Sequence, residues 1–326
     1  MVFKEFVEYI KKNIGRVLPD ELCVTHIGDQ KILKTNDTEL TALLIKGKDA
    51  NVSPIIYLNN YYKRYLDGIS LGKILQEIVE QISNSKVRES YEFDVERFYD
   101  FENIREKIVL SVVNAELNKQ LLEDTPHTIK EDLAIIYKVL VSRDINNFAT
   151  ITVNNKYLDR WKVNADKLHE CAVKNSSYLL PVTIQSMRTI LCEMYSDEII
   201  QGMELPEEMP GNEMYVISNE AKIGGAGAIF YSEALSELAD KLGTDLYILP
   251  SSIHEVIAIP VNSLAPKELE EMVGEVNETQ LMPEEILSNH VYRYNADTKE
   301  IKLLDTASEC QKEGACLEEK MQRKTR

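Results

Sequence analysis

The stretch from Asp245 to Pro260 constrains the fold most strongly, because two apolar runs there flank one short polar turn. Its sequence is Asp-Leu-Tyr-Ile-Leu-Pro-Ser-Ser-Ile-His-Glu-Val-Ile-Ala-Ile-Pro. Short apolar runs rich in β-branched and aromatic residues on either side of a turn predict a β-hairpin. The turn also carries serine, histidine and glutamate, so the hairpin is expected to build the core and to present polar groups at its bend.

The segments before this hairpin extend the prediction to a larger C-terminal unit. Two further strands are expected around the Gly224-Gly225 turn, and Ser232 is a typical residue for the start of the helix that follows. The expected order is β-β-α-β-β, from Met214–Ser218, Ala226–Tyr231, Glu233–Leu242 and the two arms of the hairpin. A helix from Pro266 and a final hairpin over residues 291–304 complete this region.

Across the whole chain, predicted strands and helices follow one another without a regular βαβ rhythm. This favours an α+β fold with mixed or antiparallel sheets packed against amphipathic helices. The spacing of apolar residues predicts helices over residues 3–14, 70–82, 104–122, 165–178 and 184–195. Strand patterns cover residues 22–27, 30–34, 40–45, 133–141 and 148–153. The run 133–141 is apolar on both faces and is therefore expected to be a central strand.

The polar and charged segment around residues 84–100 predicts a boundary between two parts of the chain. We expect an N-terminal α+β lobe over residues 1–86, a polar connector over 87–103 and a main α+β domain over 104–304. Residues 305–326 are polar in composition and are expected to form a disordered tail.

The negative net charge of the chain limits the classes of molecule that it is expected to bind. The chain of 326 residues has 54 acidic and 37 basic side chains and a formal charge of −17. Nucleic acids and anionic membranes require a basic surface, so neither is expected as the main partner, and an unidentified protein or small molecule is favoured. No apolar run has the length that spans a bilayer, and the N-terminus lacks a signal-peptide pattern, which predicts a cytoplasmic protein.

The sequence contains no clear motif for a cofactor site or a metal site. The five cysteines include no Cys-x-x-Cys pair, and no His-Glu-x-x-His or Asp-rich loop occurs, so no metal is expected. The segment Gly224-Gly-Ala-Gly227 resembles part of a dinucleotide-binding loop, but Phe230 stands where the third glycine would be needed. A hairpin turn is the favoured interpretation, and no cofactor is expected.

Tyrosines gather in the N-terminal lobe, where Tyr57, Tyr61, Tyr62 and Tyr65 lie within nine positions. One interpretation makes Tyr57, Tyr61 and Tyr62 a ligand-binding platform for stacked bases or sugars. The favoured alternative is that Tyr57, Tyr61 and Tyr65, spaced four residues apart, pack one face of a helix against the sheet.

The turn of the central hairpin supplies the candidate catalytic residues Ser251, Ser252, His254 and Glu255. A hydroxyl, an imidazole and a carboxylate are the groups used in acyl transfer. Catalytic triads usually converge from separate elements, however, and serines in turns commonly hydrogen-bond the local backbone. A structural bend is therefore favoured, with a ligand contact and a catalytic role as alternatives.

Several stretches together resemble an uncharacterised bacterial family, domain of unknown function 5688. The stretches that carry the resemblance are Ser53–Leu58 with Tyr61-Tyr62, Val113–Asn118, Pro250–Glu255, Val276–Thr279, Glu284–Ser288 and Val291–Tyr294. Pro-Ser-Ser-Ile-His-Glu is the most specific of them. The resemblance implies a shared fold up to about residue 304 and transfers no catalytic role.

Two classes of function follow from these observations. The favoured one is a non-enzymatic binding or interaction protein, because the acidic chain shows no complete catalytic constellation. The alternative is a hydrolase-like enzyme in which His254 acts with Ser251 or Ser252 and with a carboxylate from another part of the chain.

Deleting the residues after Asp305 should leave the melting temperature within about one or two degrees, because this segment offers little apolar surface to bury. Thermal melts of the full chain and the shortened chain measure the effect. A fall of about ten degrees would show that the segment docks on the folded part.

Overall fold

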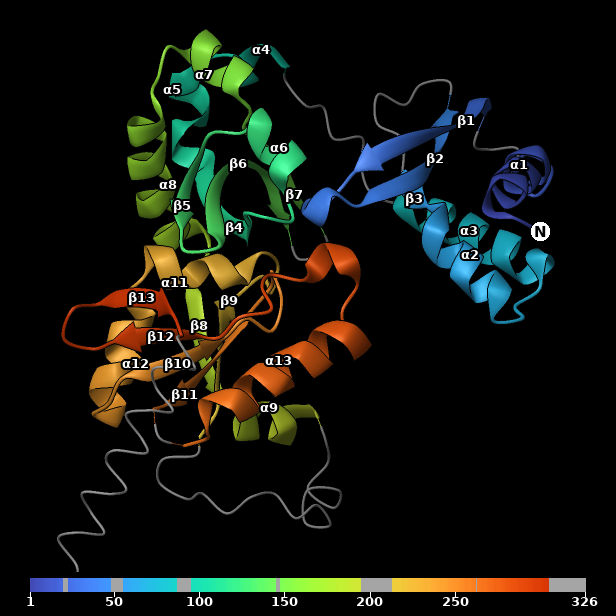
Figure 1. Cartoon of the computed structure of the whole chain (residues 1–326). Coiled ribbons are helices and arrows are strands. Elements are labelled where there is room, and N and C mark those ends of the chain that lie inside the picture. Colours follow the sequence, from blue (N-terminus) through green and yellow to red (C-terminus); the bar gives the residue numbers. More distant parts are fainter. Residues whose placement is uncertain are drawn as a thin grey trace, which may run out of the picture. The chain divides into compact units, whose positions relative to one another are not determined.

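The chain divides into two units, Met1–Val95 and Glu96–Arg326 (Figure 1). The computed structural model describes residues 1–19, 23–47, 55–86, 95–144, 147–194, 213–261 and 263–304. The boundary lies within the expected connector 87–103, part of which is outside the described residues, so the connector stays a prediction. The expected tail at 305–326 also lies outside them.

The smaller unit packs helices against an antiparallel sheet of order β1-β2-β3. Its elements are α1 (Phe3–Ile14), β1 (Val24–Leu33), the 3-10 helix η2 (Thr35–Asp37), β2 (Glu39–Gly47), β3 (Ile55–Tyr57), α2 (Leu58–Leu66) and α3 (Leu71–Lys86). Apolar residues spaced three and four apart bury one face of α1, including Phe6 and Ile10, and one face of α3, including Ile74 and Ile78. These faces share one core.

The larger unit contains two antiparallel sheets (Figure 1). In the first sheet, the middle strand β6 pairs with β4, with β5 and with β7. The second sheet has the order β13-β12-β10-β11-β9-β8. The strands are β4 (Ile108–Asn114), β5 (His127–Lys130), β6 (Leu133–Asp144), β7 (Asn147–Thr152), β8 (Val182–Ser186), β9 (Tyr215–Asn219), β10 (Leu246–Leu249), β11 (Val256–Pro260), β12 (Tyr292–Asn295) and β13 (Glu300–Leu303).

Helices and short helical turns connect these strands. They are α4 (Val95–Phe98), α5 (Phe101–Ile104), η3 (Arg105–Lys107), α6 (Lys119–Glu123), α7 (Asn155–Trp161), α8 (Ala165–Leu179), α9 (Met187–Met194), η4 (Gly225–Gly227), α11 (Ala228–Tyr231), α12 (Ala234–Leu242), α13 (Pro266–Thr279) and η5 (Pro283–Glu285). The side chain of Asn154 caps α7 by accepting the N–H of Tyr157 at 3.2 Å, the usual role of asparagine at a helix start. Buried residues of α8 pack on β4, where Ser176 Oγ accepts the N–H of Leu110 at 2.8 Å.

The predicted α+β fold is confirmed, and so are most of its segments. The apolar run 133–141 is part of the central strand β6, and the hairpin around Asp245–Pro260 forms as β10 and β11. Within the described residues, no helix combines the length and apolar character needed to cross a membrane.

The predicted helix over residues 104–122 is wrong. Residues Ile108–Asn114 form strand β4, and all seven side chains are buried. An apolar run rich in valine and isoleucine fits a doubly buried strand as well as a helix face, and periodicity alone does not separate the two. The polar residues of this region still bond the backbone, since Asn118 Nδ2 donates to the carbonyl of Asn114 at 2.8 Å.

Three other expectations also need correction. Residues 22–27 and 30–34 were expected to form two strands, but one continuous strand, β1, runs through both segments. The chain turns after β1, at Asn36 and Asp37, which adopt positive φ angles that these residue types tolerate. Residues 184–186 belong to β8, so the helix expected over 184–195 begins only at Met187. Residues 226–231 are helical, so the unit expected as β-β-α-β-β lacks its second strand.

Asp132, in the turn between β5 and β6, connects the two sheets of the larger unit. Its carboxylate accepts the hydroxyl of Tyr292 on β12 at 2.5 Å and the hydroxyl of Ser288 at 2.7 Å. Burial and the nearby carboxylate raise the pKa of Tyr292 well above its usual range, so this hydroxyl stays protonated and donates. Asn114 Nδ2, at the end of β4, donates to the same carboxylate at 3.4 Å.

Replacing Asp132 by alanine should lower the free energy of unfolding by about 2–4 kcal/mol, because the buried hydroxyl of Tyr292 loses its acceptor. Chemical denaturation of Asp132→Ala, Tyr292→Phe and the double variant measures the coupling between the two residues. The exposed neighbour provides a control, since Glu131→Gln should change stability by less than about 0.5 kcal/mol. Strictly additive single effects would contradict a shared interaction.

Candidate functional site

The hairpin turn and the glycine-rich segment, separated in sequence, lie against each other. Gly225 approaches the turn so closely that a Cβ at this position would lie 2.5 Å from the carbonyl oxygen of His254 and 2.2 Å from Ser218 Oγ. Asn219 holds the start of the glycine-rich segment, donating to the carbonyl of Ile223 at 3.0 Å. The glycines therefore serve close packing of two backbone segments.

The imidazole of His254 bridges these two segments. Its Nδ1 accepts the backbone N–H of Gly224 at 3.1 Å. Because Nδ1 is an acceptor, the neutral ring carries its proton on Nε2, which lies 3.9 Å from Glu285 Oε1. Both side chains are partly exposed, so the predicted residue His254 and Glu285, which the sequence analysis did not name, face solvent together.

The other candidate residues of the turn bond to the backbone. Ser252 is buried, and its Oγ accepts the N–H of His254 at 3.0 Å, while its N–H donates to the carbonyl of Glu255 at 3.1 Å. Ser251 and Glu255 are half-buried in the same turn. A triad would require a serine hydroxyl directed at the imidazole ring, and Ser252 is instead directed at the main chain.

The tyrosines of the smaller unit are engaged with their own fold. The hydroxyl of Tyr61 donates to Gln81 Oε1 at 2.9 Å, and that of Tyr62 donates to the carbonyl of Met1 at 3.0 Å. The Tyr62 ring also meets Phe3 edge-on, with centroids 5.1 Å apart. Tyr57 lies on β3 beneath the ammonium of Lys34. Tyr61 and Tyr62 on α2 thus pack on the core of their own unit, whereas Tyr57 lies on a strand and not on the helix face expected for it. The ligand-binding role of the tyrosines stays a prediction.

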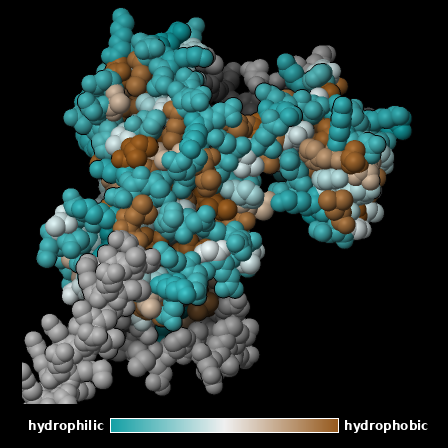
Figure 2. Space-filling model, in the orientation of Figure 1, coloured by the Kyte–Doolittle hydropathy of each residue, from teal (hydrophilic) through white to brown (hydrophobic). Residues whose placement is uncertain are grey.

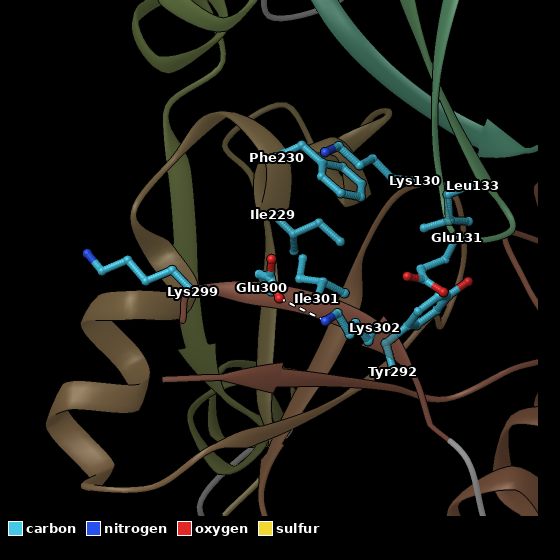
Figure 3. A pocket seen from close by; sticks show the side chains of 10 residues that line it. All are labelled: Lys130, Glu131, Leu133, Ile229, Phe230, Tyr292, Lys299, Glu300, Ile301 and Lys302. Atoms are coloured by element: carbon cyan, nitrogen blue, oxygen red, sulfur yellow. Dashed lines mark ion pairs between the residues drawn. The ribbon is translucent and has the colours of Figure 1, made fainter. Parts of the chain in front are cut away.

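A pocket of about 390 Å³ opens in the larger unit, and none of the candidate site residues proposed from the sequence lines it (Figure 3). It lies between β13 and the β5–β6 turn. Its lining is apolar or aromatic at Leu133, Ile229, Phe230, Tyr292 and Ile301, and charged at Lys130, Glu131, Lys299, Glu300 and Lys302. An apolar floor with a few charged groups at its rim is typical of ligand sites.

Charges at the rim of the pocket are unevenly paired. Lys302 Nζ lies 2.9 Å from Glu300 Oε2, and Lys299 Nζ lies 3.6 Å from Glu233 Oε2. Lys130 forms no ion pair within the described part of the chain, and Figure 3 shows its side chain among those that line the pocket. Lys130 can therefore meet a negatively charged group of a ligand.

Little in the sequence indicated this pocket. Its residues come from the β5–β6 turn, from α11 and from the β12–β13 hairpin, which are separated by up to about 170 positions. Tyr292 lay within a stretch that resembled the family, and this was the single signal that could have drawn attention to it. The surrounding lysines and glutamates are ordinary surface residues in sequence.

The family model for a family of unknown function, DUF5688, matches residues 3–296. The chain belongs to DUF5688. This match confirms the resemblance, and it covers both units of the DUF5688 chain. No curated protein and no solved structure matches the chain.

Four of the stretches on which the resemblance to DUF5688 rests are connected by hydrogen bonds in the larger unit. Asn114, Ser288 and Tyr292, from three such stretches, all donate to Asp132. A fourth contributes Asn277, which donates to the carbonyl of Ser288 at 2.9 Å. Among the described residues of the DUF5688 chain, no group of three or more His, Cys, Asp or Glu side chains is arranged to hold a metal ion.

Replacing Gly225 by alanine should destabilise this DUF5688 chain by about 1–3 kcal/mol or more, because the new methyl group would overlap Ser218 and the backbone at His254. The matched control is Gly274→Ala in α13, where a Cβ meets no atom within 4 Å. That change should stabilise the protein by about 0.5–1 kcal/mol, since alanine favours a helix. Denaturant midpoints compare the two, and equal effects would contradict the close approach.

Proposed function

We propose that this protein is a non-enzymatic binding protein whose ligand site is the pocket between β13 and the β5–β6 turn. The main support comes from the hydrogen bonds of the turn residues. The groups that suggested acyl transfer, Ser252 and the Nδ1 of His254, accept backbone N–H groups and so stabilise a turn. The open pocket, by contrast, lies in another part of the same unit and combines apolar and charged groups.

The charge of the chain supports a protein or small-molecule ligand. A formal charge of −17 opposes stable contact with nucleic acids or with anionic membranes. Hydrophilic residues cover most of the face in Figure 2, and hydrophobic residues reach it in separate patches. This is the usual surface of a protein that functions in water, and we propose the cytoplasm as its compartment.

A hydrolase-like enzyme is the second candidate, favoured by the pair of His254 and Glu285. A carboxylate beside an imidazole orients the ring and stabilises its protonated form in many acyl-transfer enzymes. Glu285 comes from a separate element, η5, as such a partner must. The enzyme would need Ser251 or Ser252 to turn its hydroxyl toward the ring when substrate binds, and the Nδ1 of His254 would have to release the N–H of Gly224 so that it could accept the serine proton.

Variants of His254 test the choice between these functions. In a binding protein with a structural turn, His254→Asn keeps an acceptor near the Nδ1 position, and His254→Gln keeps side-chain reach, so each should change the free energy of unfolding by about 1 kcal/mol or less. Wild-type protein should remain unlabelled by a fluorophosphonate probe, which reacts with activated serines. Thermal melts and mass spectrometry of the probe-treated protein measure both.

Labelling of Ser251 or Ser252 that disappears in both His254 variants would establish the hydrolase and contradict the non-enzymatic proposal. Labelling that persists in the variants would indicate chemical reactivity without the imidazole. A heat-denatured sample provides the control for non-specific reaction.

A further inference from the structure

The pocket follows an open edge of a sheet. Strand β13 is the last strand of its sheet and, among the described residues, pairs with β12 alone. Three consecutive residues of β13, Glu300, Ile301 and Lys302, line the pocket. Successive side chains of a strand point to opposite faces, so a pocket lined by all three must run along the edge of the strand.

The main-chain groups at this edge can be assigned from the register. Leu304 N–H donates to the carbonyl of Val291 at 2.9 Å, and these residues lie directly opposite each other in the β12–β13 pairing. In antiparallel strands, the residues that bond the neighbouring strand alternate with residues whose N–H and C=O point away. Ile301 and Leu303 therefore direct their N–H and C=O groups toward the open edge.

We propose that an extended peptide segment of a partner protein binds along β13 as an additional strand, with an apolar side chain in the pocket. This inference rests on the proposed binding function and specifies the ligand. Unpaired main-chain groups spaced two residues apart are satisfied together by another extended main chain, which is how sheet edges commonly bind peptides. A small molecule would satisfy them only singly.

The lining of the pocket indicates the composition of the peptide. Ile229, Phe230 and Ile301 offer an apolar surface for one side chain of the peptide. Lys130 also lines the pocket (Figure 3) and, unlike Lys299 and Lys302, forms no ion pair among the described residues, although Glu300 is near enough to interact with it electrostatically. A peptide with an apolar residue close to an acidic residue therefore fits this edge.

The contribution of the edge N–H is tested by a pair of substitutions at Leu303. Proline at this position removes the N–H that points to the open edge and leaves the hydrogen bonds to β12 in place. Edge strands tolerate proline. Leu303→Ala is the matched control, because it shortens the partly exposed side chain and keeps the N–H. Thermal melts verify that both variants fold.

The probe is a phage-displayed library of random heptapeptides, selected on the full chain, with fluorescence anisotropy of the selected peptides as the measurement. Leu303→Pro should weaken binding by about tenfold, as expected for loss of a main-chain hydrogen bond, and Leu303→Ala by less than about threefold. Lys130→Glu should also weaken binding of peptides that carry an acidic residue, and it serves as the second test if the proline variant does not fold.

Each other outcome overturns the inference in a different way. Selected peptides that bind Leu303→Pro and Lys130→Glu as tightly as wild type would place the binding site elsewhere, and the proposed binding function would survive. Peptides that bind only a chain shortened after Leu304 would show that residues 305–326 take the edge instead of a partner. Failure to select any peptide with either chain would remove the peptide site, whereas the serine probe tests the non-enzymatic function separately.

Discussion

The larger unit depends on the carboxylate of Asp132. Apolar cores hold two sheets together without fixing their alignment, because burial of apolar surface is not directional. Hydrogen bonds are directional, and Asp132 accepts them from Tyr292 and Ser288, while Asn114 donates from the strand β4. A single turn residue therefore fixes the position of the β5–β6 hairpin relative to β12. The same contact places Tyr292 in the wall of the pocket.

The hairpin turn around His254 shows how polar groups can be placed to stabilise irregular backbone. Segments outside helices and sheets still have N–H groups that require acceptors when they are buried. His254 supplies one acceptor to Gly224, and Ser252 supplies another to His254 itself. The residue types of an acyl-transfer site therefore occur here as acceptors for backbone N–H groups. The pair of His254 and Glu285 is the feature of this turn on which the hydrolase-like alternative rests.

The sequence predicted the parts of this fold that local patterns determine. The amphipathic stripe of α1 and the doubly apolar strand β6 follow from spacing and residue type. Strand β4 was mistaken for a helix because a short run of valine and isoleucine suits either structure when both sides are buried. The helical turn after Gly225 was missed because close approach between distant backbone segments leaves no local signal. The pocket was missed for a similar reason, since Lys130 and Ile301 become neighbours only through the pairing of whole sheets.

The separation of Asp132 from its partners has a consequence for synthesis on the ribosome. Tyr292 follows Asp132 by 160 residues, and Ser288 follows it by 156. Strands β4 to β7 pair with one another and can assemble as soon as they emerge, because their contacts are local. The β5–β6 turn then carries a carboxylate that has Asn114 of β4 as a donor but lacks the hydroxyls of Ser288 and Tyr292 until the last strands are made. The nascent chain therefore passes through a stage in which one sheet is complete, while its alignment with the second sheet is settled only late in synthesis.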